Sequence, residues 1–355
     1  MSALFTPLPL RGVTLPNRVG LAPMCQYRAE ADGRPNDWHR VHLGARAVGG
    51  AGLVLTEATA VVPEGRISPQ DTGLWSGAQV DAWRPITDFL TRQGSVPAVQ
   101  LAHAGFKAST YRPWASRSGG VPDADGGWTP VGPGAEPFVP GYRTPTALDT
   151  AGIEAVVEAF GAAAARAVDA GFAAVEVHAA HGYLLHEFLS PLTNHRTDGY
   201  GGDRAGRMRL TVEVVRAVRA AVGGDVPVLA RISATDWVDG GWTVDDSVAL
   251  TGELAAAGVD LVDCSSGGAS PGARIPVGPG YQVPLAARVR RDTGVPTGAV
   301  GLIVEPEQAE RIIAEGEADL VLLGRELLRD PYWPRRAAAK LGADPGWPAP
   351  YARAF

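Results

Sequence analysis

Cysteine and long apolar runs are both scarce in this sequence. The 355 residues include only Cys25 and Cys264, which lie far apart, so the chain carries no disulfide framework and each thiol is either reactive or a small buried residue. No stretch of about 18 apolar residues occurs, which argues against a membrane-spanning helix. The first residues lack the basic start and apolar core of a signal peptide. We therefore expect a cytoplasmic protein.

An excess of basic charge is also missing. The net charge is -6, and the 32 lysines and arginines form no run along the chain. This balance argues against a nucleic-acid partner or an anionic membrane surface, since both favour a basic face. Hydrophobic residues make up 45% of the sequence, which is enough to bury a full core. The composition indicates a soluble globular protein.

Short β-like runs that end in polar or glycine-rich turns alternate with helix-like segments along the whole chain. Eight such runs occur, at residues 18–24, 53–60, 98–102, 173–178, 226–232, 259–264, 296–300 and 319–323. The helix-like segments between them are residues 37–49, 78–93, 150–170, 204–222, 244–257, 283–292, 305–315 and a last one from residue 325. This alternation predicts an α/β fold, a (β/α)8 TIM barrel that forms one domain over residues 1–355.

Two segments fall outside the repeating pattern. Residues 108–149, after the third strand, are rich in glycine, proline and aspartate in their central part, and we interpret them as a lid over one end of the barrel. A disordered excursion is the alternative. The tail at residues 342–355 is aromatic and proline-rich, and it can pack on its own subunit or on a neighbouring one.

The most informative stretch of the sequence follows the fourth strand. It sets His178, His181 and Tyr183 just beyond an apolar run, at the strand's carboxyl end, where parallel α/β proteins bind ligands. The His-x-x-His spacing is also compatible with a metal site, although no other ligand stands at a familiar spacing. A pair of histidines satisfied by backbone carbonyls is a further alternative. The barrel's position rule favours a functional role, and we expect no metal.

Other strand ends carry polar or glycine-rich sequence as well. These residues are Cys25, Tyr27, Gln100, His103, Arg231, Ser265, Ser266, Gly298, Gly301, Gly324 and Arg325. Glycines after strands seven and eight, each followed by a helix, are typical of the phosphate site of this fold, and Arg325 can add a charge-assisted bond. Ordinary turn chemistry is the alternative for either glycine turn alone.

Several motifs in fixed order resemble the old yellow enzyme family. They are Ala22-Pro23-Met24-Cys25-Gln26-Tyr27, Gln100-Leu101-Ala102-His103-Ala104-Gly105, His178-Ala179-Ala180-His181-Gly182-Tyr183, Asn194-His195-Arg196-Thr197-Asp198 and Gly324-Arg325-Glu326-Leu327-Leu328. The resemblance runs from the first strand to Arg353. The Cys25 and Tyr27 pair, the His-x-x-His form and the short lid point to the thermophilic-like ene-reductase class.

The resemblance implies an FMN-dependent, NADPH-consuming enzyme that reduces the activated C=C bond of α,β-unsaturated carbonyl compounds. In it, His178 and His181 bind the carbonyl oxygen and Tyr183 donates a proton. Arg231 suits an anionic reduced flavin, and Gln100 suits the pyrimidine edge of the ring. The full set of implied cofactor contacts is Ala22, Pro23, Met24, Cys25, Ala58, Gln100, Arg231, Gly301, Gly324 and Arg325.

Tyr27 and Arg353 are the remaining substrate-side residues that the resemblance implies. Arg353 matches an arginine that reaches a neighbouring subunit's active site, which implies a homodimer or homotetramer; a tail that packs in cis is the alternative. Tyr27 can instead be a packed aromatic and Cys25 a small buried residue. Lys107 matches a family lysine without an assigned role, and Cys264 belongs to the core.

Three other functions compete with the ene-reductase hypothesis. A dienoyl-thioester reductase has a similar barrel, but it carries an iron–sulfur cluster and a further flavin domain that two cysteines do not support. A flavin-binding redox sensor using Cys25 has no need of two histidines and a tyrosine arranged for a carbonyl. A lyase or aldolase needs a Schiff-base lysine or a metal, and Lys107 is the nearest candidate.

Overall fold

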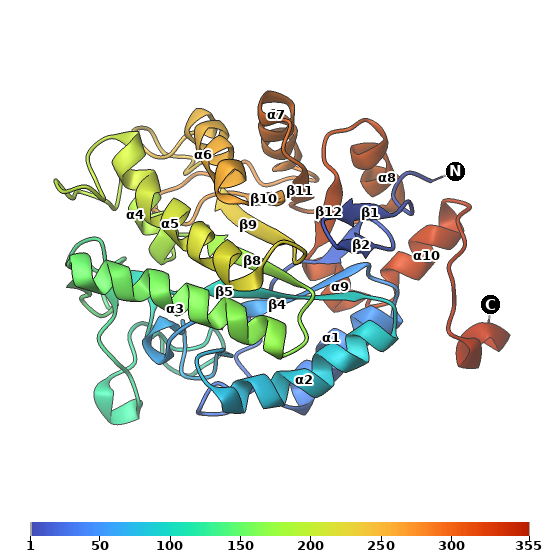
Figure 1. Ribbon diagram of the computed structural model, residues 1–355, viewed down its shortest axis with the longest axis horizontal. Coiled ribbons are helices and arrows are strands. Elements are labelled where there is room, and N and C mark those ends of the chain that lie inside the picture. Colours follow the sequence, from blue (N-terminus) through green and yellow to red (C-terminus); the bar gives the residue numbers. More distant parts are fainter. Residues whose placement is uncertain (1, 355) are drawn as a thin grey trace.

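A closed barrel of parallel strands forms the centre of the molecule in the computed structural model, which describes residues 2–354 (Figure 1). The eight strands run in spatial order β3 (Val19–Leu21), β4 (Leu53–Ala60), β5 (Val96–Ala102), β8 (Ala174–Ala179), β9 (Val228–Ser233), β10 (Leu261–Ser265), β11 (Thr297–Val300) and β12 (Leu320–Leu323). Strand β12 pairs with β3 and closes the ring. The predicted TIM barrel is confirmed.

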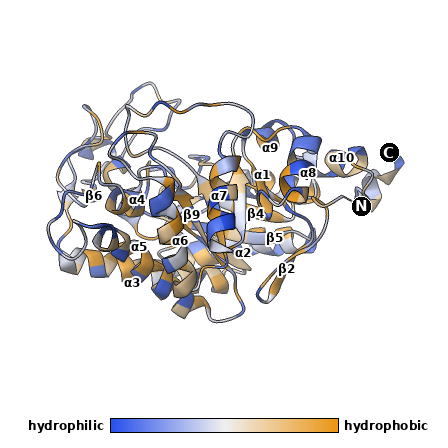
Figure 2. Cartoon of the chain, turned by 90° about the horizontal axis from the view of Figure 1, so that it is seen from above, coloured by the Kyte–Doolittle hydropathy of each residue, from blue (hydrophilic) through white to orange (hydrophobic). Residues whose placement is uncertain are grey.

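Helices surround the barrel and cover its outer face (Figure 1). They are α1 (Asp37–Val48), α2 (Gly77–Arg92), α3 (Thr150–Asp169), α4 (Leu184–Leu189), α5 (Arg204–Val222), α6 (Val244–Ala257), α7 (Val283–Thr293), α8 (Pro306–Ala314), α9 (Arg325–Arg329) and α10 (Trp333–Lys340). Orange and blue residues mix along these helices in Figure 2, as expected for helices that bury one face. Within residues 2–354, no helix is long and apolar enough to cross a membrane.

Most element boundaries lie within two residues of the predicted ones, and proline explains the two larger differences. Strand β3 ends at Leu21 because Pro23 has no N–H to donate; the last backbone bond on this side runs from Ala22 N to Leu323 O at 3.0 Å. The helix predicted from residue 325 is divided into α9 and α10. The residue before Pro331 is extended there, with φ -137° and ψ 90°, as a following proline favours.

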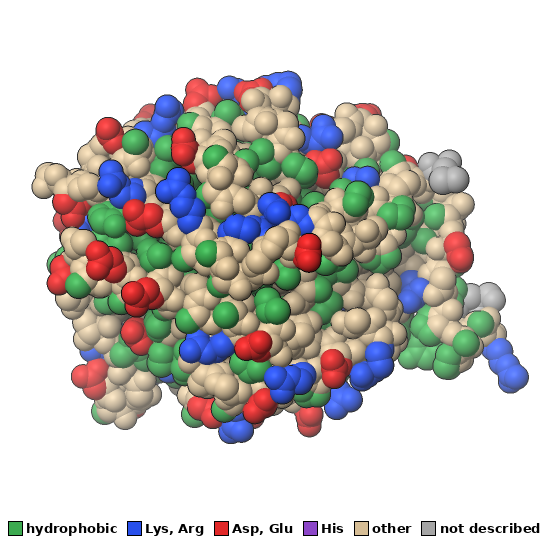
Figure 3. Space-filling view, in the orientation of Figure 1, with side chains coloured by type: hydrophobic (Ala, Val, Ile, Leu, Met, Phe, Trp, Pro, Cys, Tyr) green, Lys and Arg blue, Asp and Glu red, His purple; other side chains and the backbone are tan. Residues whose placement is uncertain are grey.

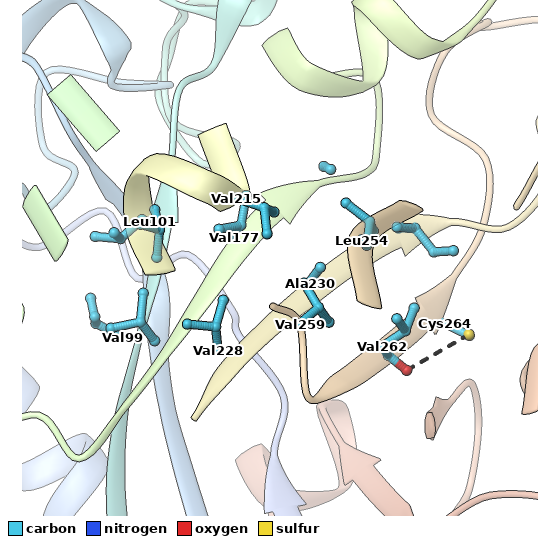
Figure 4. Packing of buried hydrophobic residues seen from close by; sticks show 14 of the residues in the cluster. Val99, Leu101, Val177, Val215, Val228, Ala230, Leu254, Val259, Val262 and Cys264 are labelled. Atoms are coloured by element: carbon cyan, nitrogen blue, oxygen red, sulfur yellow. Dashed lines mark hydrogen bonds between the residues drawn. The ribbon is translucent and has the colours of Figure 1, made fainter. Parts of the chain in front are cut away.

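Apolar residues on the outward face of the strands form the main core. Val99, Val177, Val228 and Val262 point away from the barrel axis and pack under helices that contribute Val215 and Leu254 (Figure 4). Cys264 lies in the same layer and is fully buried, which agrees with its assignment to the core. Because strand residues alternate between faces, the neighbours of these residues in sequence point into the barrel.

A hairpin that the sequence analysis did not predict closes the amino end of the barrel. It consists of β1 (Leu8–Leu10) and β2 (Val13–Leu15). Its leucines join the inward-facing apolar residues of the strands in a separate cluster, made of Leu8, Leu10, Leu15, Ala22, Leu53, Leu55, Val96, Ala98, Ala174, Leu229, Leu261, Leu320 and Leu322. Any functional site within the barrel must therefore open at the carboxyl end.

The segment at residues 108–149 lies outside the barrel and contains the short strands β6 (Val131–Gly132) and β7 (Thr146–Ala147) and the turn η3 (Asp123–Asp125). Side-chain bonds fix parts of it. Trp128 Nε1 donates to Glu64 O at 2.7 Å, and the ring of Phe138 packs 5.2 Å from that of Phe106, next to Lys107. The segment thus contacts loops at the carboxyl end of the barrel.

Candidate active site

The rings of His178, His181 and Tyr183 face one another at the carboxyl end of β8. The ring centroid of His178 lies 5.2 Å from that of His181 and 5.1 Å from that of Tyr183, both in edge-to-face geometry. His178 belongs to the strand itself, whereas His181 and Tyr183 follow in the turn before α4. His181 Nε2 lies 2.7 Å from Ser265 Oγ at the end of β10. The fold therefore brings together the three residues that sequence analysis placed at this end of the strand.

Lys107 holds the turn that carries His181. Its Nζ donates to the backbone oxygens of His181 at 2.8 Å and Gly268 at 2.7 Å, and it lies 4.0 Å from the ring centroid of Phe138. His181 has a φ of 61°, a conformation that a non-glycine residue keeps only when its surroundings fix it. Lys107 is thus part of the support of this turn, a role that sequence analysis left open.

Burial keeps the three side chains uncharged at neutral pH. Removal from water lowers the pKa of His178 and His181 well below the usual range, and the nearby Arg231 lowers it further. Burial raises the pKa of Tyr183 well above its usual value, with Cys25 and Asp71 as further causes. Each neutral imidazole can donate one N–H, and the phenol keeps its proton. The group is chemically suited to bind an oxygen that becomes negative and to deliver a proton.

A layer of polar side chains fills the barrel directly below the histidines. Gln100 Nε2 donates to Glu176 Oε1 at 2.8 Å, and Arg231 Nε pairs with Asp263 Oδ2 at 2.9 Å. Burial raises the pKa of both acids, and for Glu176 the neighbouring Asp263 adds to the effect, while Arg231 opposes it in both. Sequence analysis missed Glu176 and Asp263 as site residues. A charged residue at an inward position of a buried strand was the available signal.

Cys25, Tyr27 and Tyr183 pack on one small apolar cluster beside the histidines, together with Ala58, Ile67, Ala102, Ala104, Ala108 and Trp128. Ala58 pairs with Gln100 in the strand register. Tyr27 has a φ of 51° and an edge-to-face contact with Trp114 at 5.5 Å. Burial raises the pKa of Cys25, so its thiol is protonated. The first-strand motif therefore lies on the same side of the site as Tyr183.

A pocket of about 180 Å³ opens at the carboxyl ends of β11 and β12, and Arg231, Ser265, Gly301, Gly324 and Arg325 are among its lining residues. A Cβ added to Gly324 would meet Met24 Sδ at 3.5 Å and Ala22 Cβ at 3.9 Å, so the glycine leaves space between the first and last strands. Four of the expected cofactor contacts thus line one pocket, namely Arg231, Gly301, Gly324 and Arg325. Two more, Ala22 and Met24, lie beside it.

Gln282 extends this pocket and was not predicted. Its Oε1 accepts from Ser266 Oγ at 2.6 Å, and its Nε2 donates to Val300 O at 3.0 Å. It joins the ends of β10 and β11, and no local motif marked this residue, which directly precedes α7 (Val283–Thr293), as part of a site.

One expected site residue lies elsewhere. Arg353 is exposed in η4 (Ala349–Ala354), beside α10 and at the opposite end of the molecule from α4 (Figure 1). The chain does not bring Arg353 to its own site. Within residues 2–354, no three His, Cys, Asp or Glu side chains are grouped so that they could hold a metal ion. Acidic and basic side chains are interspersed over the face drawn in Figure 3.

The sequence matches a known family and curated relatives along nearly all its length. The model of the NADH:flavin oxidoreductase / NADH oxidase family matches residues 3–344. The NADPH dehydrogenase of Geobacillus sp. (strain WCH70) is 46% identical over 340 residues, which cover 96% of this chain and 94% of that protein.

Solved structures have the same fold. Morphinone reductase superposes with a TM-score of 0.80 at 30% identity, over 96% of this chain and 90% of that one. A 2-naphthoyl-CoA reductase superposes with a TM-score of 0.86 at 26% identity, but the chain spans only about half of it, 52%. The family model, the curated relatives and the superposed barrel agree. The chain belongs to the NADH:flavin oxidoreductase / NADH oxidase family, that of old yellow enzyme, and is an oxidoreductase that uses FMN and a nicotinamide cofactor.

Proposed function

We propose that this protein is an ene-reductase, which takes electrons from NADPH and reduces the activated C=C bond of α,β-unsaturated carbonyl compounds. One observation carries the proposal. The neutral ring of His178 lies 5.2 Å from the neutral ring of His181 and 5.1 Å from the protonated phenol of Tyr183, beside a pocket that two glycine-rich strand ends line. An oxygen clamp with a proton donor next to it is what conjugate reduction of an enone requires from the protein.

The residues around the barrel mouth fit FMN. Gly301, Gly324 and Arg325 would hold the phosphate, because the glycines leave the pocket open and the guanidinium supplies positive charge. Gln100 and Arg231 would contact the ring, with Ala22, Pro23, Met24, Cys25 and Ala58 from the first two strands as its other neighbours. FMN held by these residues would supply the hydride-transfer chemistry between NADPH and the substrate. Arg231 keeps positive charge near the site.

The protein's own part begins with the substrate carbonyl. His178 and His181 donate hydrogen bonds to its oxygen, which polarises the alkene and stabilises the enolate that forms when the β-carbon is reduced. Ser265 and Lys107 position His181 for this contact. Ser265 Oγ fixes the imidazole ring, and Lys107 Nζ fixes the backbone oxygen. Tyr183 then gives its proton to the α-carbon of the enolate. Tyr27 contributes a second phenol to the substrate side of the pocket.

The purified protein tests the reaction as a whole. We expect a yellow protein whose colour bleaches when NADPH is added without oxygen and returns when cyclohexenone follows. A colourless preparation that FMN cannot reconstitute would refute the flavin assignment. Bleaching without recovery on enone addition would leave an NADPH-oxidising flavoprotein and contradict the ene-reductase proposal.

Phenol binding tests the two histidines separately from catalysis. A para-substituted phenol mimics the enolate oxygen, and its complex with oxidised flavin gives a long-wavelength charge-transfer band. His178→Ala or His181→Ala should weaken phenol binding about tenfold, equivalent to about 1.4 kcal/mol, with FMN still bound. His42→Ala is the control, because His42 is buried in α1 away from the barrel mouth. Unchanged phenol affinity in the first two variants would contradict the clamp.

Two finer assignments belong to the same proposal. We place the enzyme in the cytoplasm, and we propose a homodimer or homotetramer in which Arg353 reaches a neighbouring active site. The exposed position of Arg353, far from the chain's own site, supports a role in trans. Arg353→Ala should then raise KM for the enone without changing the FMN content. Sedimentation velocity that shows only monomers at assay concentration would exclude the shared site.

A further inference from the structure

The turn that carries His181 and Tyr183 is held in a conformation that its own backbone does not favour. His181 has a φ of 61° and Gly182 a φ of 70°, so two consecutive residues lie in the left-handed region, and the first of them is not a glycine. Ser233 Oγ accepts from His181 N at 2.9 Å, and Lys107 Nζ donates to His181 O at 2.8 Å. Side chains from outside the turn thus fix its shape.

His186 binds the same turn at its middle residue. Gly182 N donates to His186 Nδ1 at 2.8 Å. A neutral imidazole carries one proton, and a ring nitrogen that accepts a hydrogen bond has none, so the proton of His186 is on Nε2. His186 belongs to α4 and is fully buried, and the mechanism above gives it no part. The tautomer of His186 therefore decides whether this side chain can accept from Gly182.

Asp236, in the loop after β9, faces the other ring nitrogen. Its Oδ1 lies 3.0 Å from His186 Nε2, and neither side chain is exposed. Its Oδ2 accepts from Ser190 Oγ at 2.6 Å and from Trp242 N at 2.8 Å. Burial by itself would raise the pKa of Asp236, but these three neighbours outweigh burial and hold the pKa below its usual value. A carboxylate beside Nε2 favours the proton there and leaves Nδ1 as the acceptor.

The order of these contacts excludes a nucleophilic triad. In such a triad the histidine lies between the serine and the carboxylate and takes the proton of the serine. Here Asp236 lies between Ser190 and His186, and all three side chains are fully buried. The contacts lead instead from the loop after β9 through His186 to Gly182, the residue between His181 and Tyr183.

We propose that His186 is a positioning residue, which sets the turn of the active site through its bond to Gly182 N. Asp236 holds the imidazole in the tautomer that this bond needs. The inference rests on the proposed roles of His181 and Tyr183. Because Gly182 joins these two residues, a rotation of its peptide would move both side chains, and the oxygen clamp and the proton donor would lose their alignment with the enone.

Two substitutions separate the functions of the two ring nitrogens. In His186→Asn, the amide oxygen takes the place of Nδ1 and can still accept from Gly182 N, but the shorter side chain cannot reach Asp236. In His186→Gln, the terminal amide lies near the place of Nε2 and reaches Asp236, but no acceptor remains for Gly182 N.

The readouts are phenol affinity, from the charge-transfer band, and stopped-flow reoxidation of the NADPH-reduced enzyme by cyclohexenone. We expect His186→Gln to weaken phenol binding about tenfold and to slow reoxidation about 10-fold to 100-fold. His186→Asn should stay within about threefold of the wild type in both. FMN content should be unchanged in both variants, because His186 does not line the pocket at the ends of β11 and β12.

Asp236→Asn tests the tautomer while the imidazole stays in place. The amide oxygen can still accept from Ser190 and Trp242, but an N–H then faces His186 Nε2, which must accept and leave its proton on Nδ1. Asp236→Asn should therefore resemble His186→Gln, and it gives the same test if His186→Gln does not fold. Added to His186→Asn, it should weaken phenol binding no further, because no imidazole tautomer remains to be changed. A further tenfold loss in the double variant would overturn the role of Asp236.

His42→Asn is the matched control, since it replaces a buried histidine of α1 away from the barrel mouth. It should leave phenol affinity and reoxidation unchanged, whatever its effect on thermal unfolding. Equal phenol affinity and equal reoxidation in His186→Asn and His186→Gln would mean that only packing matters, and would refute the positioning role.

The clamp itself is tested separately by His181→Ala. Unchanged phenol affinity in that variant would refute the clamp, and this inference with it. Weakened phenol binding in His181→Ala together with wild-type behaviour of His186→Gln and Asp236→Asn would refute the positioning role alone.

Discussion

The two ends of the barrel are built from the same strands but from opposite kinds of residue. Towards the amino end, Ala98, Ala174, Leu229 and Leu261 point inward and pack against the hairpin of β1 and β2. Two residues further along the same strands, the inward positions hold a buried polar layer, made of Gln100, Glu176, Arg231 and Asp263. Inward positions recur every two residues along a strand, so the inward side chains change from apolar to polar between one such position and the next.

The difference teaches how this fold divides stability from function. Apolar packing at the amino end buries no charge and has no desolvation penalty. The charged groups of the polar layer do have that penalty, and it is offset because its members pair with one another. A TIM barrel places its active site at the carboxyl end, where loops converge, so the charged residues lie where a flavin and a substrate can use them. The amino end then stabilises the scaffold that holds them.

The largest expected effect comes from breaking the ion pair of the polar layer. Arg231→Met leaves Asp263 and Glu176 buried without their cation, and we expect the free energy of unfolding to fall by about 3–5 kcal/mol. The variant should also lose FMN, because the positive charge near the ring is gone. Urea denaturation and the flavin absorbance of the purified protein measure the two effects.

Leu229→Ala is the matched change at the apolar end, two residues away on β9. It should cost about 2–5 kcal/mol through lost packing, yet keep a full complement of FMN. If both variants retained FMN equally well, the proposal that the carboxyl end binds the cofactor while the amino end only stabilises the barrel would be wrong.

A smaller effect is expected from pH at the polar end. Burial lowers the pKa of His103 from 6.5 to about 4, so the unfolded chain binds a proton there before the folded one does. The stability from neutral His103 is fully present above pH 6.5 and is lost as the pH falls towards 4. His103→Gln should therefore lose less stability than the wild type over this interval, by about 3 kcal/mol. A pH-independent difference between the two proteins would contradict this assignment.

The smallest effect is expected in the hairpin that covers the amino end. A Cβ at Gly12 would lie 3.0 Å from Asp225 Cβ and Asp225 O, which requires a slight shift of the turn. Gly12→Ala should lower the free energy of unfolding by about 1 kcal/mol and leave the flavin spectrum and the enone reaction unchanged. A changed flavin spectrum would show that a shift in the hairpin at the amino end alters the environment of the flavin at the other end.

Much of the fold could be predicted because its signals are local. The bounds of β4, α5 and α6 agree with the predicted ranges residue by residue, since apolar runs, caps and glycine stops mark them. The hairpin at residues 8–15 was missed, because three-residue strands carry too little periodicity. The split between α9 and α10 was also missed, although Pro331 marked it.

The site was predictable only in part. His178, His181 and Tyr183 stand close together in sequence at the end of a strong strand. Cys25 follows a strand, and Gln100 and Arg231 lie two residues before the ends of theirs. Lys107 lies in a loop whose partner, His181, is 74 residues away, and no local pattern reports such a contact. The order of the strands around the barrel had to be known before the Lys107 side chain could be placed near Tyr183.

The sequence by itself determined the barrel, the end of it that carries chemistry and the family, because strand periodicity and short motifs are properties of neighbouring residues. Only the tertiary structure decided that Glu176 and Asp263 share Arg231 and that Lys107 fixes the turn of His181. These facts depend on burial and on contacts between distant strands. The protonation states of the buried side chains follow from that burial, so they are properties of the folded chain alone.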